Sequence, residues 1–215
     1  MKIFLLILLV IGFNSCNRVK EIDPKFQAIN DIGEKIQIED IPESNILFIQ
    51  YRGDYSQHPK ALTELMNYVG ENYRIVGTCL GIYPFDPDAV PSDSLVWDVG
   101  IRVIPGDPAM VHEDGDTFQV RASEEELSVP LDDLKYPEAP YQLKKIGSTK
   151  AITVETIVEN AGKEGLAMDA WLTMHGYVQV APTIMEYAMV DVEPTKVPVK
   201  IIIPVKERMT GLSLI

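Results

Sequence analysis

Residues 46–51 read Ile-Leu-Phe-Ile-Gln-Tyr, a run of β-branched and aromatic residues that predicts a strand. Gly53 ends this run, and a helical pattern follows with Pro59 in its first turn, where helices tolerate proline. One face of that helix is apolar, with side chains at helical spacing: Leu62, Leu65, Met66, Val69 and Tyr73. Strands are predicted next at 77–83 and 95–104. The block from about 41 to 104 therefore has the order strand, helix, strand, strand.

A second block, from about 141 to 205, repeats this order. Its helix is expected to end at His175, because Gly176 follows. Its strands are predicted at 151–158, 181–189 and 197–205. The repeat predicts an α+β fold in which duplicated βαββ modules form a two-half antiparallel-sheet domain. A central cleft between such halves is a common place for a small-molecule site.

Composition limits the classes of partner. The chain has 215 residues, of which 46% are hydrophobic and 24% charged, as in ordinary globular proteins. Its formal charge is -13, from 19 basic and 32 acidic residues. This charge argues against non-specific nucleic-acid binding, which needs Lys and Arg on phosphates. It mildly favours a neutral or cationic ligand over an anionic one.

The amino terminus has the pattern of an export signal. Lys2 precedes an apolar run over residues 3–13, which is too short to span a bilayer as a helix. The run and the Cys16 that follows resemble the lipobox of bacterial lipoproteins, where the cysteine is lipidated. We therefore expect a signal peptide over 1–15, then lipidated Cys16 and a polar tether over 16–33. The expected location is the bacterial cell envelope, anchored to a membrane at its periplasmic or outer-membrane face. An uncleaved or non-lipidated export signal is the alternative.

Three motifs resemble the gyrase-inhibitor-like (GyrI-like) small-molecule-binding domain, which also forms the effector-binding part of some AraC-type and MerR-type regulators. They are Ile41-Pro42 running into Tyr51-Arg52-Gly53-Asp54-Tyr55; Gly81-Ile82-Tyr83-Pro84 with Val90-Pro91 and Trp97-Asp98; and Gly176-Tyr177 with Pro182-Thr183-Ile184-Met185-Glu186-Tyr187 and Ile202-Ile203-Pro204-Val205. The resemblance covers about residues 34–206 and leaves 207–215 as a tail. It implies a ligand cleft. Residues 17–33 are too short for a helix-turn-helix, so we expect no nucleic-acid partner.

Glu186 is the main candidate for chemistry. It interrupts an otherwise apolar strand, and alternation places its side chain on the face shared by Ile184 and Ala188. A buried carboxylate is unfavourable unless it is paired, hydrogen-bonded or protonated. The resemblance implies that this Glu faces the ligand, where it could hold a cation or act as an acid/base in members that hydrolyse ligands. The alternative is an exposed Glu, or one paired with a lysine such as Lys200.

Four aromatic residues are candidate walls of the ligand site: Tyr83, Trp97, Tyr141 and Trp171. Aromatic faces bind apolar or cationic ligands, and plain core packing is the alternative for each. The resemblance implies that the Tyr141 hydroxyl could lie near Glu186. Asp98 and Glu155 are secondary carboxylates, for which surface exposure is the favoured interpretation.

Other chemistries find little support. His58, His112 and His175 are far apart, with no cysteine or histidine at ligand spacing, so no metal and no cofactor are expected. Cys79, in an apolar stretch, is interpreted as a buried residue. Three hypotheses remain: a lipid-anchored binding protein for an apolar or cationic small molecule, a hydrolase that uses Glu186 and Tyr141, and a non-catalytic envelope interaction protein.

Overall fold

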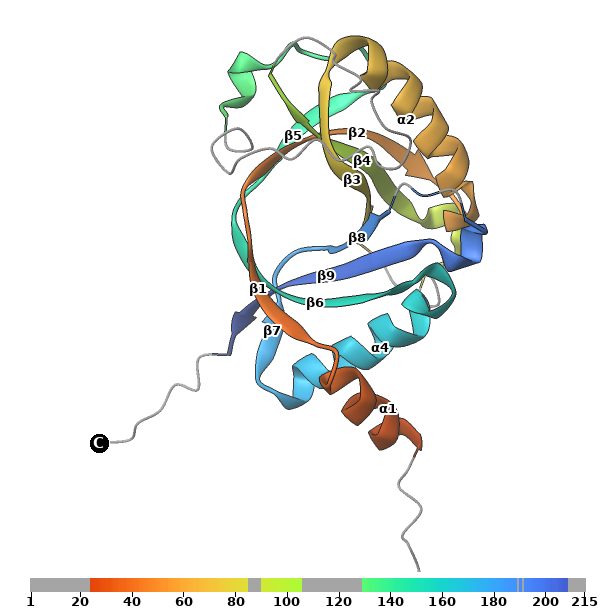
Figure 1. The fold of residues 1–215 in the computed structure, drawn as a ribbon, viewed down its shortest axis with the longest axis vertical. Coiled ribbons are helices and arrows are strands. Elements are labelled where there is room, and N and C mark those ends of the chain that lie inside the picture. The colour runs from red at the N-terminus through yellow and green to blue at the C-terminus, as the bar shows by residue number, and fades with distance from the viewer. Residues whose placement is uncertain (1–23, 85–89, 106–128, 189, 191, 209–215) are drawn as a thin grey trace, which may run out of the picture.

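The computed structural model describes residues 24–84, 90–105, 129–188, 190 and 192–208. The first module has the order β2-α2-β3-β4, and the second has β6-α4-β7-β8-β9 (Figure 1). The helices are α1 (Pro24–Gly33), α2 (His58–Asn72) and α4 (Val158–Met174). The strands are β1 (Gln37–Ile41), β2 (Ser44–Arg52), β3 (Arg74–Tyr83), β4 (Val96–Ile104), β5 (Gln142–Ile146), β6 (Thr149–Ile157), β7 (Tyr177–Gln179), β8 (Thr183–Tyr187) and β9 (Pro198–Glu207). The predicted α+β fold with repeated βαββ modules is confirmed.

The nine strands of the described residues belong to one antiparallel sheet. The order is β1-β6-β9-β8-β3-β4-β2-β5, and the short β7 pairs with β9. The two modules meet where β3 pairs with β8, from Cys79 opposite Tyr187 to Tyr83 opposite Thr183. The last part of β3 and the whole of β8 therefore lie side by side at the seam between the modules.

A continuous ribbon ties the two ends of the sheet together. Strand β1 pairs with β6, beginning with Gln37 opposite Thr153, and β2 pairs with β5, ending with Phe48 opposite Gln142. The two pairings have the same register. Only two residues separate β1 from β2, and two separate β5 from β6. Figure 1 shows the result, a strongly curved sheet with an inner and an outer face.

The helices α2 and α4 cover the outer face of the sheet. Alternate residues of each strand point to this face. In β4 these are Trp97, Val99, Ile101 and Val103, which pack with Leu65 and Val69 of α2. Cys79 also lies in this core and is fully buried, as predicted. A second core forms under α4 around Ile152, Met168 and Ile201, and a third lies on the inner face around Ile46, Leu80 and Ile202.

The prediction of a polar tether was wrong for residues 24–33, which form α1. This helix packs against α4, and its Ile29 and Ile32 are only 8% and 2% exposed. The approach is close at Gly33, where a Cβ would lie 3.1 Å from Trp171 Nε1. The expected signal peptide and Cys16 lie outside the described residues. Within the described residues, no helix is long and apolar enough to cross a membrane.

Candidate functional site

Six aromatic side chains gather on the outer face at the seam, and together we call them the aromatic cluster. They come from both modules and from six secondary-structure elements, with two of them at strand ends. Its members are Tyr51 of β2, Tyr55 of a short 3-10 turn, His58 of α2, Tyr83 of β3, Trp97 of β4 and Tyr187 of β8.

A tight turn after β2 brings Tyr55 and His58 onto Trp97. Gly53 has a φ of 116°, which favours glycine. Asp54 then accepts a hydrogen bond from the Ser56 backbone N–H at 2.7 Å, and the chain continues into the first residue of α2. The indole Nε1 of Trp97 donates to the Gly53 carbonyl oxygen at 2.9 Å. The turn and the indole therefore hold one another in place.

The ring geometry is that of a packed aromatic box around Trp97. Its centroid lies 5.5 Å from that of Tyr51, 5.7 Å from Tyr55, 5.9 Å from His58 and 6.2 Å from Tyr83. These separations lie in the range in which aromatic pairs attract one another. Gly81 leaves room for this arrangement, because a Cβ there would lie 2.3 Å from the Tyr83 hydroxyl oxygen.

Two tyrosine hydroxyls meet across the seam. The Tyr83 and Tyr187 hydroxyl oxygens are 2.8 Å apart and share a hydrogen bond. Burial raises the pKa of Tyr187 to about 12 and raises the pKa of Tyr83 well above its ordinary value. Both phenols are therefore protonated at neutral pH, and each module contributes one of them.

His58 is the polar member of the aromatic cluster on the helix side. Burial lowers the pKa of His58 to about 4, so its imidazole is neutral at pH 7. Its Nε2 is buried and has no hydrogen-bond partner among the described residues. With neutral imidazole and protonated phenols, the rings of the cluster carry no net charge at neutral pH.

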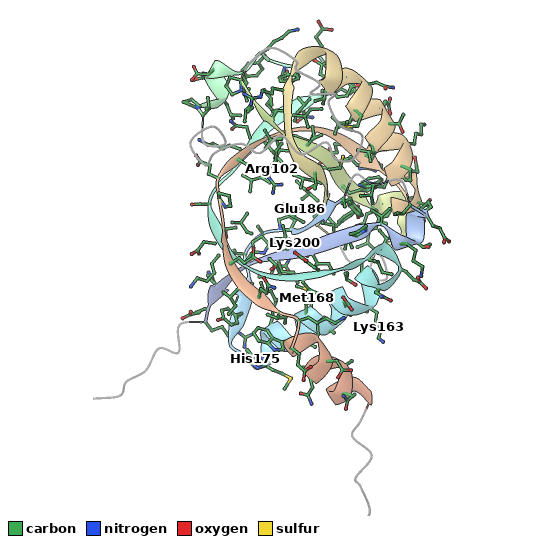
Figure 2. The ribbon with its side chains drawn as sticks, viewed as in Figure 1. Arg102, Lys163, Met168, His175, Glu186 and Lys200 are labelled. Atoms are coloured by element: carbon green, nitrogen blue, oxygen red, sulfur yellow. The ribbon has the colours of Figure 1, made fainter. Side chains whose placement is uncertain are left out.

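Glu186 lies on the other face of the sheet. Since neighbouring residues of a strand point to opposite faces, Tyr187 joins the aromatic cluster and Glu186 points inward. Its carboxylate forms an ion pair with Arg102 of β4, and the two side chains are 19% and 16% exposed. Lys200 is its register partner on β9. Figure 2 shows Glu186, Arg102 and Lys200 on the inner side of the curved sheet. The expectation that Glu186 shares a cleft with Trp97 and Tyr83 does not match this placement.

Two further ion pairs on the inner face involve Lys200 and Lys144. Lys200 Nζ lies 2.7 Å from Glu39, which also accepts from Thr153 at 2.8 Å. The hydrogen bond from Lys200 is the main reason that the pKa of Glu39 is lowered. Lys144 bonds Asp98 at 2.6 Å, so Asp98 is paired rather than exposed.

The remaining candidates lie apart from the aromatic cluster. Tyr141 stacks on Tyr68 with 3.8 Å between ring centroids. Its hydroxyl donates to the Glu64 carbonyl oxygen at 3.4 Å, beside α2 on the outer face. It is therefore not beside Glu186. Trp171 stacks on His175 at 3.9 Å and packs into the core under α4.

Two further sequence interpretations concern solvent and metal. Glu155 is exposed, as predicted. Among the described residues, no group of three or more His, Cys, Asp or Glu side chains could hold a metal ion. His112, the third histidine considered as a ligand, lies outside the described residues.

Four members of the aromatic cluster were not predicted from the sequence as site residues: Tyr51, Tyr55, His58 and Tyr187. Tyr51, Tyr55 and Tyr187 stand in the quoted motifs, and strand alternation from Tyr187 could have shown that it faces away from Glu186. Nothing in the sequence around His58 indicates that its ring is buried.

The chain resembles solved structures in fold. No family model matches it, and no curated protein matches it. The crystal structure of the EcmrR C-terminal domain is similar with a TM-score of 0.57 at 12% identity, over 80% of this chain and 97% of that one. The EcmrR–DNA complex has a TM-score of 0.60 at 13% identity, over 85% of this chain and 65% of that one. A hydrolase encoded by lin2189 from Listeria innocua has a TM-score of 0.50 at 16% identity, over 80% and 92%. At these identities the likeness shows the fold.

Proposed function

We propose that the chain is a small-molecule-binding module and that its site is the aromatic cluster. The observation that carries this proposal is the convergence of rings from both modules, closed by the hydrogen bond between Tyr83 and Tyr187 at 2.8 Å. Binding sites for small molecules are mostly apolar and aromatic, with a few polar atoms that orient the ligand. The fold shared with the EcmrR C-terminal domain supports the proposal.

The polar atoms distinguish this cluster from ordinary core. Most other residues of the core under α2 are Leu, Val, Ile and Ala, together with Cys79 and Tyr73, and the Tyr73 hydroxyl donates to the Lys135 carbonyl oxygen at 2.6 Å. The aromatic cluster contains two phenol hydroxyls and one imidazole at the seam. Five of its six members keep some exposure to solvent, and only Trp97 is fully buried, at 1% exposed. A ligand could therefore reach ring faces without dismantling the core.

The charge of the site selects the class of ligand. The exposed Glu64 carboxylate accepts a hydrogen bond from the Tyr51 hydroxyl of the cluster, and the whole chain has a formal charge of -13. Cation–π attraction to Trp and Tyr contributes about 0.5–2 kcal/mol. We therefore propose neutral aromatic molecules and lipophilic cations as ligands, in preference to anions. The same negative charge does not favour a nucleic acid as partner.

The hydrolase hypothesis loses its geometric basis. It requires Glu186 and Tyr141 to act on a ligand held by the aromatic walls. The Glu186 carboxylate is bound by Arg102 on the inner face, and Tyr141 lies on the outer face beside α2. A binding role is the function that the arrangement supports best.

A charge-matched panel tests the binding proposal. The probes are 2-naphthol, naphthyl-trimethylammonium and 2-naphthalenesulfonate, which share one ring system and differ in charge. Equilibrium dialysis of the full chain should show saturable binding of the neutral and cationic probes and weaker binding of the anion. Saturation with probe at 100 times its Kd should also add about 2.7 kcal/mol to stability. Failure of all three probes to bind would favour the interaction-protein hypothesis.

We also propose that the chain is exported and anchored to the cell envelope through a lipid on Cys16. The support is the sequence pattern of the first sixteen residues. Metabolic labelling with radioactive palmitate should label the wild type, and Cys16→Ser should abolish the label and release the protein from the membrane fraction. An unlabelled wild type that is still exported would favour a non-lipidated signal.

A further inference from the structure

His58 has a place in the aromatic cluster that packing alone does not explain. It is the first residue of α2, and its ring stacks on Trp97 at 14° between planes. The centroid of Tyr187 lies 4.6 Å from that of His58, and the centroid of Tyr83 lies 6.5 Å from it. The imidazole therefore stands among rings from both modules.

The imidazole has one polar atom with nothing to bond. Nε2 is buried and without a hydrogen-bond partner among the described residues. Buried polar atoms in native proteins are nearly always satisfied, so an exception calls for a reason. A phenylalanine would give the same stacking without this penalty. The nearby hydroxyls of Tyr83 and Tyr187 already bond to each other.

The state of the ring defines what it can bond. Burial keeps the pKa of His58 at about 4, so the ring is neutral and Nε2 offers a single hydrogen bond as donor or acceptor, according to tautomer. A ligand hydroxyl can serve in either role. A carboxylate or sulfonate would find no positive charge on this ring.

Building on the proposed function, we infer that His58 is the residue that determines the ligand specificity of the aromatic cluster. The aromatic cluster takes uncharged aromatic molecules that carry a hydroxyl group, and that hydroxyl bonds to Nε2 of His58. The ring system of the ligand packs against the ring faces around Trp97. Analogues that lack the hydroxyl bind more weakly, because they leave Nε2 without a partner.

A pair of probes of equal size tests this inference. 2-Naphthol and 2-methylnaphthalene differ only in a hydroxyl against a methyl group. Equilibrium dialysis of the full wild-type chain should give a Kd about tenfold lower for 2-naphthol. His58→Phe should bind both probes equally, because it keeps a ring and removes the nitrogen. His58→Gln should restore part of the preference, because its amide can reach the position of Nε2.

A second measurement separates ligand recognition from a structural role. In the absence of ligand, His58→Phe should melt at the same temperature as the wild type or higher, since it removes an unsatisfied buried atom. Long-range 1H–15N spectra should show the His58 Nε2 resonance shifting with 2-naphthol and not with 2-methylnaphthalene. These spectra are recorded on the wild-type chain, so the test does not depend on whether a variant folds.

The outcomes distinguish this inference from the proposed function. Equal binding of both probes by the wild type, or an unchanged preference in His58→Phe, overturns the role of His58 and leaves a binding site in place. A chemical shift of His58 Nε2 that does not change at saturating 2-naphthol also overturns the role of His58. Absence of binding by either probe overturns both.

Discussion

Glu186 and Tyr187 are consecutive residues of β8, and their side chains bond to partners on opposite faces of the sheet. The Glu186 carboxylate pairs with Arg102 on the inner face, whereas the Tyr187 hydroxyl bonds to that of Tyr83 on the outer face. One strand therefore supplies an ion pair to the inner face and a ring to the aromatic cluster. This relationship separates residues that stabilise the sheet from residues that could bind a ligand.

The first prediction concerns the ion pair. Glu186→Gln leaves Arg102 without its partner in a partly exposed setting, so we expect a loss of about 1–2 kcal/mol in the free energy of unfolding. Urea denaturation measures this loss. Glu155→Gln, at an exposed position, is the control and should change stability by about 0.5 kcal/mol or less. A stabilised Glu186→Gln would contradict the structural role given to the pair.

The second prediction concerns the hydrogen bond across the seam. Tyr187→Phe leaves the buried Tyr83 hydroxyl without this partner, and we expect a loss of about 1 kcal/mol. Tyr136→Phe is a matched control, because Tyr136 is 76% exposed and its hydroxyl can bond to water. Equal stability of the two variants in thermal melts would show that the seam does not depend on this bond.

The third prediction concerns the space above Gly81. Gly81→Ala places a methyl group against the Tyr83 ring, so the ring has to move and the aromatic cluster has to repack. Overpacking of this kind costs about 1–3 kcal/mol, and binding of 2-naphthol should weaken with it.

A glycine in open space provides the control for Gly81. No atom lies within 4 Å of a Cβ built at Gly162, which stands inside α4. Gly162→Ala should therefore stabilise the protein by about 0.5–1 kcal/mol, from helix propensity alone. If Gly81→Ala behaves like Gly162→Ala in stability and binding, the close packing of Tyr83 is not important.

The fourth prediction concerns pH. His58 takes up a proton at about pH 4 in the folded chain and near pH 6.5 when unfolded. The unfolded state therefore binds more protons between these values, and stability falls as the pH drops from about 6.5 to 4. The loss from this residue is about 3 kcal/mol. Urea titrations at several pH values should show a steeper fall for the wild type than for His58→Phe. Parallel curves would mean that folding does not lower the pKa of His58.

The sequence was sufficient for the modules and for part of the site. β-branched runs and helical spacing identified both βαββ blocks, and the motifs brought out Tyr83 and Trp97, which lie 6.2 Å apart between ring centroids. Alternation correctly grouped Glu186 with Ile184. It could not tell which face of β8 the helices cover, because that depends on how the two modules pair along β3 and β8.

Long-range packing accounts for what the sequence did not indicate. Residues 24–33 are polar enough to be interpreted as a tether, yet Ile29 and Ile32 are buried where α1 packs against α4, more than a hundred residues away. His58 enters the aromatic cluster only because the turn at Gly53 folds α2 back over Trp97. Neither relationship leaves a local pattern in the sequence.

The most direct test of the central claim is the Kd for 2-naphthol, measured by equilibrium dialysis in three single variants of the full chain. We expect Trp97→Phe to raise the Kd about tenfold through lost ring contact, whereas Trp171→Phe and Glu186→Gln should leave it within about twofold of the wild type. Binding abolished in Glu186→Gln and retained in Trp97→Phe would contradict the account and place the ligand on the inner face.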